Sequence, residues 1–485
     1  MTPELPAVLV RGVGLFAPLF LLAGLCLWRA PRPREVAAML VAGAWALLTL
    51  VPLNLYALRA GWWSFHAEGA VWLGMPVDLL LAWAVLWGAL PALLLRLLPV
   101  PLLSGLLVWV DVIIMPLAEP VVVLGPLWLL GEFVGSTLCL IPALMLAYWT
   151  RTGQLVHARM WAQALLAFGA VVVLPLAALD ALPGDPGAAF TAAQILAPVC
   201  LPGLAAAREF ARVGGGTPLP FDPPSRLVTS GPYAYLRNPM QTTVAGVYLV
   251  LAPVTGDPWL LLGALAAFAY GSGFAAWHEG GQLRAAFGRD WEAYRAGVRA
   301  WLPRWRPWPG RAPGTLYVAA DCAMCRGLGG WLAARAPVAL ERRPAAEHPE
   351  VLYRLTYENP EGLRWSGVSA LARALEHLNL GWALAGWALD LPGARHFAQL
   401  CADAFGAGPR PSREPLGGRE SGEEASVSRG GEEVSASRGG RKASASRGRE
   451  EASASHGEEE VSAFRGREET DASRGGEAPG RGTRV

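Results

Sequence analysis

Two cysteines three positions apart, Cys322 and Cys325, form the motif of this chain that is best suited to thiol chemistry. They follow an apolar run, 316–320, that predicts a buried strand, and they open a predicted helix. At a helix N-terminus a thiolate meets unpaired N–H groups and the positive end of the helix dipole. Cys322 is therefore the candidate nucleophile and Cys325 the candidate resolving thiol. A zinc site would need two more ligands, and the other histidines and Cys401 show no paired ligand spacing, so we predict no metal site.

A second group of reactive side chains lies in the segment Gly231-Pro-Tyr-Ala-Tyr-Leu-Arg-Asn-Pro-Met240. Its Gly-Pro and Asn-Pro pairs favour turns over a continuing helix, which predicts an ordered loop. The apolar runs 240–255 and 258–277 follow so closely on one another that they must form a helical hairpin. Beyond the hairpin, Glu279 precedes a stripe of apolar side chains at helical spacing, which predicts a helix lying on the membrane surface. The stripe consists of Leu283, Phe287, Trp291, Tyr294, Val298 and Trp301.

The loop, the hairpin and the residues that follow resemble the catalytic end of the isoprenylcysteine carboxyl methyltransferase and phospholipid methyltransferase superfamily. The resemblance covers about residues 220–306 and also includes Phe287-Gly288, Tyr294 and Leu302-Pro303. It implies an integral-membrane enzyme that uses S-adenosylmethionine, held between the hairpin and the following helices. The implied acceptor is a lipid, a prenyl group or another membrane-embedded molecule.

The resemblance also implies roles for single residues of this chain. It places Arg237 and Asn238 at the reaction centre, and it assigns cofactor binding to Gly231, Tyr233, Tyr235, Pro239 and Glu279. A carboxylate can bind ribose hydroxyls or an amino group, aromatic faces attract a sulfonium, and a guanidinium can orient a carboxylate or an anionic acceptor. Three positions depart from the family's common pattern. Asn238 and Gln241 replace a histidine and a tyrosine, and Gly280 replaces the second of two glutamates.

The cysteine pair belongs to a further resemblance, which covers nearly all of residues 313–407. Leu316-Tyr, Asp321-Cys-x-x-Cys325, Trp365-Ser-Gly367 and Leu391-Pro-Gly393 resemble the DCC family of thiol-disulfide oxidoreductases. The order of strand, Cys-x-x-Cys, helix and strand is typical of a thioredoxin-like α/β domain. The resemblance implies a possible thiol-containing protein partner.

The composition of the chain is that of a membrane protein with water-soluble parts. Of its 485 residues, 53% are hydrophobic and only 16% are charged, which excludes a simple secreted or cytosolic globule. A helix that crosses the hydrocarbon core needs about 20 apolar residues, and nine runs qualify. They are 10–28, 36–58, 70–95, 100–118, 127–149, 160–181, 189–207, 240–255 and 258–277.

Arginines near the span ends predict the orientation. They recur in alternate connections, at 29–34, at 96, at 151–159 and at 208–237, and basic loops stay on the cytoplasmic side. An odd number of spans then places the N-terminus outside and everything after residue 278 in the cytoplasm. The first residues lack a basic region, so we expect no cleaved signal peptide. We predict a multi-pass protein of a bacterial inner membrane.

We therefore predict a polytopic α-helical membrane protein of about nine spans with a C-terminal thioredoxin-like α/β domain and a disordered tail. The predicted segments are 1–212 for N-terminal transmembrane helices, 213–308 for the loop, hairpin and surface helix, 313–407 for the Cys-x-x-Cys domain and 408–485 for the tail. The tail repeats nine residues with few bulky apolar side chains, which favours disorder. Its alternating charges argue against a nucleic-acid partner.

Two alternatives to a methyltransferase remain open from the sequence. The chain could be a membrane-anchored thiol-disulfide oxidoreductase in which the methyltransferase-like part is inactive. It could also be a carrier, since Asp78, Asp111 and Glu132 lie in or near apolar runs, where charges are costly and usually face a partner or a wet cavity. A carrier would predict inverted repeats, and the sequence shows none.

Overall fold

The computed structural model describes residues 7–219, 221–222, 224–320 and 322–412. The described residues all fall in one compact unit. Asp321 and almost all of the predicted tail, 408–485, lie outside them, so the prediction of a disordered tail is not tested here.

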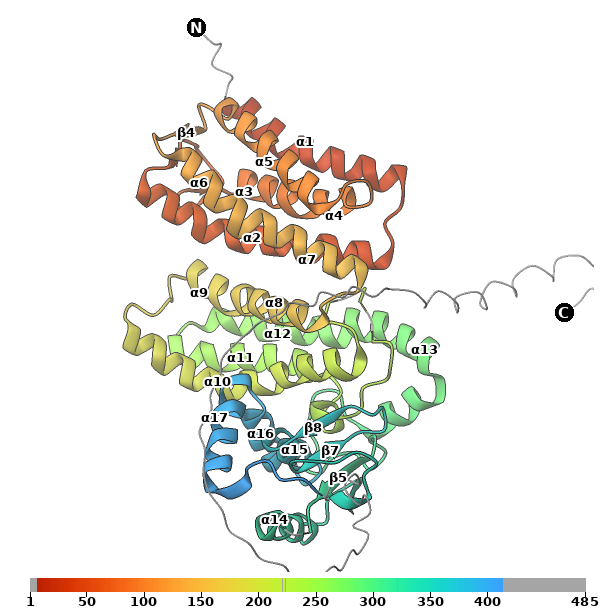
Figure 1. Ribbon diagram of the computed structural model, residues 1–485. Coiled ribbons are helices and arrows are strands. Elements are labelled where there is room, and N and C mark those ends of the chain that lie inside the picture. Colours follow the sequence, from red (N-terminus) through yellow and green to blue (C-terminus); the bar gives the residue numbers. More distant parts are fainter. Residues whose placement is uncertain (1–6, 220, 223, 321, 413–485) are drawn as a thin grey trace, which may run out of the picture. The chain divides into compact units, whose positions relative to one another are not determined.

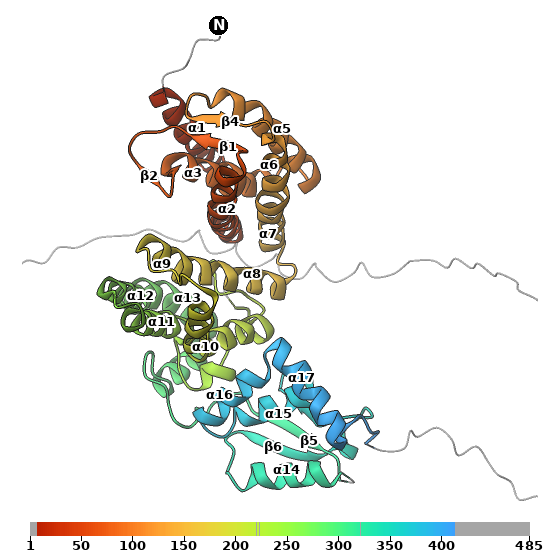
Figure 2. The same cartoon turned by 90° about the vertical axis from the view of Figure 1, so that its left-hand side faces the viewer.

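The N-terminal bundle, residues 7–152, is built from long apolar helices (Figures 1 and 2). They are α1 (Ala7–Trp28), α2 (Pro33–Ala60), α3 (Val77–Ala84), α4 (Leu90–Leu94), α5 (Val100–Leu117), α6 (Trp128–Gly135) and α7 (Ile141–Thr152). A π-helical turn joins α3 to α4, and another joins α6 to α7, so each pair forms one membrane-length segment. Four short strands pair antiparallel: β1 (Trp63–Phe65) with β4 (Val122–Leu124), and β2 (Val71–Trp72) with β3 (Met75–Pro76).

Residues 156–297 form a second group of helices. They are α8 (Val156–Phe168), α9 (Leu174–Ala178), α10 (Pro186–Glu209), α11 (Pro239–Thr255), α12 (Leu261–Tyr270) and α13 (Ala276–Gly297). Asp185 caps α10, because its Oδ1 accepts hydrogen bonds from the N–H groups of Gly187 and Ala188 at 2.8 and 3.0 Å. Helix α11 packs against both α10 and α12, and the short connection at Gly256 and Asp257 closes the expected hairpin (Figure 1).

Eight helical segments in the described residues are long and apolar enough to cross a membrane, in agreement with a polytopic membrane protein. The eighth predicted span, 240–255, forms α11, which is 17 residues long and is not among these eight segments. The count of nine spans and the orientation of the termini therefore stay predictions.

Helix α13 differs from the helix expected on the membrane surface. It bends at Gly288, whose φ of 48° is a conformation that suits glycine. Beyond the bend, Trp291, Tyr294 and Val298 are almost fully buried and pack in one cluster with Tyr233 of the loop. The apolar stripe thus packs against protein rather than lipid. A period of 3.6 residues predicts that one face of a helix is covered, but it does not say whether protein or lipid covers that face.

Residues 313–407, the C-terminal unit, form a four-stranded sheet with helices. The strands are β5 (Gly314–Val318), β6 (Leu340–Pro344), β7 (Thr356–Glu358) and β8 (Arg364–Ser366), in the order β6-β5-β7-β8. Strands β5 and β6 are parallel, whereas β7 is antiparallel to β5 and β8. The helices are α14 (Ala323–Ala333), α15 (Val368–Leu375), α16 (Leu380–Leu389) and α17 (Pro392–Ala402). Helix α17 begins directly at Pro392, since proline favours the first turn of a helix.

Candidate active site

The loop between α10 and α11 is fixed by main-chain hydrogen bonds to the segment after α13. The N–H of Arg237 donates to the carbonyl of Arg299 at 2.9 Å, and the N–H of Asn238 donates to the carbonyl of Ala300 at 3.3 Å. Pro239 then occupies the first turn of α11, where its missing N–H costs nothing. The predicted ordered loop is therefore present, and these bonds set the direction in which its side chains leave it.

The two tyrosines of the loop, Tyr233 and Tyr235, contact different parts of the protein. Tyr233 packs beside Tyr294 of α13, whose hydroxyl donates to the Tyr233 carbonyl at 2.9 Å, and the Tyr233 hydroxyl itself is buried without a hydrogen-bond partner. Tyr235 instead donates from its hydroxyl to the carbonyl of Glu376 at 2.9 Å and lies edge-on to Trp387, both in the C-terminal unit. Only Tyr233 is therefore placed to meet a ligand.

A cavity of about 1010 Å³ lies between the loop and α13. It brings together Tyr233, Arg237 and Asn238 of the loop with Glu279 of α13, four of the predicted site residues. Its other walls include Phe210, Thr217, Leu227, Met240, Gln241, His278, Gly280, Leu283, Phe287, Trp291 and Arg295. Gly231, Tyr235 and Pro239 do not line it. Its volume is at the upper end of the range of small-molecule sites.

Gly231 has a structural reason for being glycine. Its φ is 56°, and a Cβ at this position would lie 3.1 Å from Cγ of Glu209. A side chain would therefore strain the backbone and press on the end of α10. The residue shapes the turn and does not face the cavity.

The polar wall of the cavity includes groups that protein atoms leave unsatisfied. The Tyr233 hydroxyl and the Trp291 Nε1 are both buried donors without a partner, although buried polar groups are nearly always hydrogen-bonded. Burial raises the pKa of Tyr233 well above its usual value, so this hydroxyl remains a donor at neutral pH.

Arg237 provides a positive charge on the same wall. Its Nη1 donates to the carbonyl of Arg295 at 3.1 Å, which holds the guanidinium against the end of α13. Burial lowers the pKa of Arg237 from its usual value. The pKa of an arginine is so far above neutral that the guanidinium stays charged. Arg237 and Glu279 both line the cavity, together with Asp222, Arg284 and Arg295, so its wall carries charges of both signs.

A second cavity, of about 790 Å³, lies among α8, α10, α11 and α12. Its walls are almost wholly apolar, and its helices are membrane-length or part of the hairpin. Trp161, Leu165 and Phe168 of its wall on α8 have large exposed areas, which would face lipid. The two cavities share Pro218, Met240 and Gln241. A polar chamber and an apolar one therefore meet at the start of α11.

Sequence reasoning missed part of this site. Trp291 and Tyr294 belong to the stripe that was expected to face the membrane, and Met240 and Gln241 were treated only as the end of a motif. The helical spacing of Trp291 and Tyr294, in the segment that follows Glu279, was a signal that could have placed them at the site. The shared wall at Met240 and Gln241 depends on the packing of α11 against α8, which no local pattern reveals.

The cysteine pair lies elsewhere, at the start of α14. Cys322 and Cys325 are joined by a disulfide, and Sγ of Cys322 accepts a hydrogen bond from the N–H of Cys325 at 3.2 Å. Both line a groove of about 140 Å³ together with Tyr353 and Val368. The predicted position at a helix N-terminus is present, whereas activity of the pair stays a prediction.

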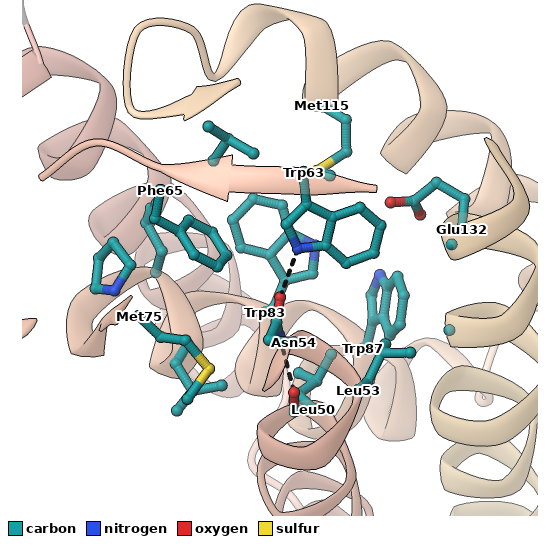
Figure 3. Close-up of a pocket in the computed structure, with 16 residues that line it drawn as sticks. Leu50, Leu53, Asn54, Trp63, Phe65, Met75, Trp83, Trp87, Met115 and Glu132 are labelled. Atoms are coloured by element: carbon teal, nitrogen blue, oxygen red, sulfur yellow. Dashed lines mark hydrogen bonds between the residues drawn. The ribbon is translucent and has the colours of Figure 1, made fainter. Parts of the chain in front are cut away.

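The charges of the N-terminal bundle are arranged differently. Asp78 pairs with Arg11 at 2.6 Å, and Oδ1 of Asp111 accepts from Nε1 of Trp83 at 2.9 Å. Glu132 lines a pocket of only about 40 Å³ among tryptophans (Figure 3). In the same pocket Nε1 of Trp63 donates to Oδ1 of Asn54 at 2.9 Å. This pocket offers room for little more than water.

The comparisons with known proteins agree with the location of the large cavity. Residues 216–290 match the family model described as phospholipid methyltransferase, a stretch that contains the loop, the hairpin and the first part of α13. No curated protein and no solved structure matches the chain. The match favours a membrane methyltransferase, and it includes Tyr233, Arg237, Asn238 and Glu279.

Proposed function

We propose that this chain is an integral-membrane methyltransferase that uses S-adenosylmethionine and acts on a lipidic or lipid-attached acceptor. The observation that carries the proposal is the meeting of the two cavities at Met240 and Gln241, inside the stretch that matches the phospholipid methyltransferase model. One cavity has the volume and polar groups for a water-soluble cofactor, and the other has the apolar walls for a lipid chain.

The residues of the large cavity fit the cofactor by their chemistry. Glu279 would accept hydrogen bonds from ribose hydroxyls or an amino group, and Arg237 would bind a carboxylate with its planar fork. The hydroxyl of Tyr233 and the indole of Trp291 would donate to acceptors of the ligand, and their rings would attract positive charge. When bound, the cofactor supplies an activated methyl group on a positively charged sulfur.

The chain's contribution to the reaction is positioning. Transfer between two bound molecules requires the acceptor atom to lie in line with the bond that breaks, and holding both partners can supply this alignment without a metal. The start of α11, where both cavities are lined by the same residues, is the place at which an acceptor headgroup would meet the cofactor. Asn238 is at this position and can hold an acceptor atom by hydrogen bonding, but its amide cannot act as a base.

Binding of S-adenosylmethionine to the purified full chain in nanodiscs tests the proposal. Glu279→Gln should raise the dissociation constant at least tenfold, because a hydrogen bond to a charged group contributes roughly 1.5–3 kcal/mol. Asp290→Asn is the matched control, since Asp290 lies on the same helix, is exposed and does not line the cavity. Absence of binding to the wild type, or equal affinity in both variants, would contradict the assignment.

The thiol pair supports a second proposed activity, thiol-disulfide exchange by a thioredoxin-like C-terminal unit. The observation that favours it is the placement of Cys322 and Cys325 at the start of α14, beside a groove that could receive a partner. The strand order and directions of the sheet are those of a strand-helix-strand unit extended by an antiparallel hairpin. Cys322 should be alkylated only after reduction, and failure of a reversible Cys322 to Cys325 bridge to form would exclude exchange.

A further inference from the structure

The C-terminal unit is joined to the end of α10 by ion pairs that are buried. Arg373 of α15 places Nη2 2.6 Å from Oε2 of Glu209, and these side chains are only 7% and 3% exposed. Arg208 and Arg212 of the same part of the chain lie 2.7 and 3.0 Å from Oδ2 of Asp390. Charges removed from water in this way need their partners, because an isolated buried charge is costly.

The loop of the large cavity is attached to this same network. The hydroxyl of Ser230 donates to Oε1 of Glu209, and Gly231 lies against the Glu209 side chain. Tyr235, four residues further on, donates to the carbonyl of Glu376. Both ends of the turn that carries Tyr233 are therefore bound to groups that the C-terminal unit holds.

Glu376 connects these contacts to one another. Its carbonyl accepts from Tyr235 at 2.9 Å and from Nη1 of Arg311 at 2.7 Å. Its carboxylate accepts from Nε1 of Trp387 at 3.0 Å and lies 3.3 Å from Nη1 of Arg373. Arg373 thus stands between the two acidic residues, one at the base of the loop and one that fixes Tyr235.

A tethered accessory domain would behave differently. Interfaces between loosely joined domains are more polar and wetter, and relative motion is the usual expectation. Here the contacting charges exclude water, and Tyr235 is 1% exposed. Displacement of the C-terminal unit would remove Arg373 from Glu209 and Glu376 from Tyr235, and it would leave the loop with its hydrogen bonds to Tyr294 and to residues 299–308.

We infer that the C-terminal unit is a structural part of the cofactor site, in which Arg373 and Glu376 act as positioning residues that fix the turn carrying Tyr233 and Arg237. The inference rests on the proposed function for its consequence, cofactor binding, but not for its premise, the order of the loop. Arg373 and Glu376 do not line the large cavity, so any effect they have on the cofactor passes through the loop.

Hydrogen exchange of the full chain in nanodiscs tests the inference without any ligand. In the wild type, the N–H groups of Tyr235 and Arg237 are hydrogen-bonded at 3.0 and 2.9 Å and should exchange slowly. Arg373→Met should speed exchange in residues 231–238 at least tenfold and leave α2 unchanged. It should also raise the dissociation constant for S-adenosylmethionine about tenfold.

Matched variants make the outcome decisive. Arg364→Met is the control, because Arg364 is in the same unit but forms an exposed pair with Glu350, and it should change neither measurement. The double variant Glu209→Gln, Arg373→Met removes one of the two stranded carboxylates, since Glu376 keeps its own, and should recover part of the protection. If Arg373→Met does not fold, Tyr235→Phe removes a single hydrogen bond and should speed loop exchange about threefold.

The results separate the two proposals. Loop exchange within twofold of the wild type in both Arg373→Met and Tyr235→Phe would overturn the inference, whatever the cofactor does. A wild type that binds no S-adenosylmethionine would overturn the proposed function, while faster loop exchange in the variants would still support the positioning role.

Discussion

The pocket of the N-terminal bundle and the large cavity beside the loop are lined by similar groups but differ in size. Each contains a carboxyl group and a buried indole N–H without a partner: Glu132 with Trp87, and Glu279 with Trp291. The first encloses about 40 Å³ and the second about 1010 Å³. The difference shows that a polar group within membrane helices does not by itself mark a ligand site. The space that such groups face decides which of them can bind a molecule.

The bundle's charges should matter for folding alone, and this is the largest effect we expect. Glu35 of α2 lies 2.8 Å from Arg96, and both side chains are nearly fully buried. Glu35→Ala strands the arginine and should lower the free energy of unfolding by roughly 3–5 kcal/mol, measured by denaturation in detergent. The exposed pair of Arg284 and Glu292 is the control, and Arg284→Ala should lower the free energy of unfolding by less than about 1 kcal/mol. An equal loss in both variants would remove the distinction between buried and exposed pairs.

Filling the apolar cavity should block transfer and spare cofactor binding. Ala267 of α12 lines this cavity, and Ala267→Trp would place an indole where an acceptor chain would lie. We expect methyl transfer to fall about thirtyfold, which corresponds to about 2 kcal/mol of lost acceptor binding, within the range that overpacking costs. Leu262→Trp, on the outer side of the same helix, should have no effect. A loss of cofactor affinity in Ala267→Trp would mean that the two cavities do not have separate roles.

Acidification should weaken the C-terminal unit through His377. Nδ1 of this buried ring lies 2.7 Å from the Val338 carbonyl and Nε2 lies 3.0 Å from the Tyr357 hydroxyl, an arrangement that suits the neutral form. Burial, and then the charge of Arg311, hold the pKa of His377 well below its usual 6.5. Below about pH 6.5, His377 therefore binds a proton in the unfolded unit but stays neutral in the folded unit. Its stability is complete above about pH 6.5 and falls at lower pH by up to about 1.4 kcal/mol per pH unit.

Limited proteolysis of the C-terminal unit between pH 5 and 7.5 measures this decline. His377→Gln should flatten the pH dependence, whereas His396→Gln, a change on exposed α17, should retain it. The same decline in His377→Gln would assign the effect to another group.

The smallest effect is expected where the N-terminal pocket is changed without stranding a charge. Glu132→Gln keeps the shape of the side chain and replaces its carboxyl group with an amide. We expect S-adenosylmethionine affinity and methyl transfer to stay within twofold of the wild type, because this pocket is too small for either reactant. A tenfold loss would show that the bundle takes part in catalysis.

The sequence was informative where local chemistry decides the structure. The Gly-Pro and Asn-Pro pairs predicted the loop, the short connection after Thr255 predicted the hairpin, and together they place Arg237 and Glu279 on one cavity. The thiol motif was likewise placed at a helix start. These features depend on residues close together in the chain.

Contacts between distant segments were not predictable in the same way. Tyr235 was assigned to the cofactor with Tyr233, but its partner is a main-chain carbonyl 141 positions away, and a carbonyl has no sequence signature. Arg208 and Arg212 were counted only as indicators of orientation, whereas both pair with Asp390. The apolar stripe of α13 was expected to lie on the membrane surface, whereas Trp291, Tyr294 and Val298 pack in one cluster with Tyr233.

The wall shared by the two cavities at Pro218, Met240 and Gln241 has a consequence for the kinetics of the proposed enzyme. A water-soluble donor and a bilayer-resident acceptor would arrive from different phases and occupy different chambers, so neither would obstruct the path of the other. Two-substrate kinetics should then follow a random order of addition. The Michaelis constant of each reactant should not change with the concentration of the other.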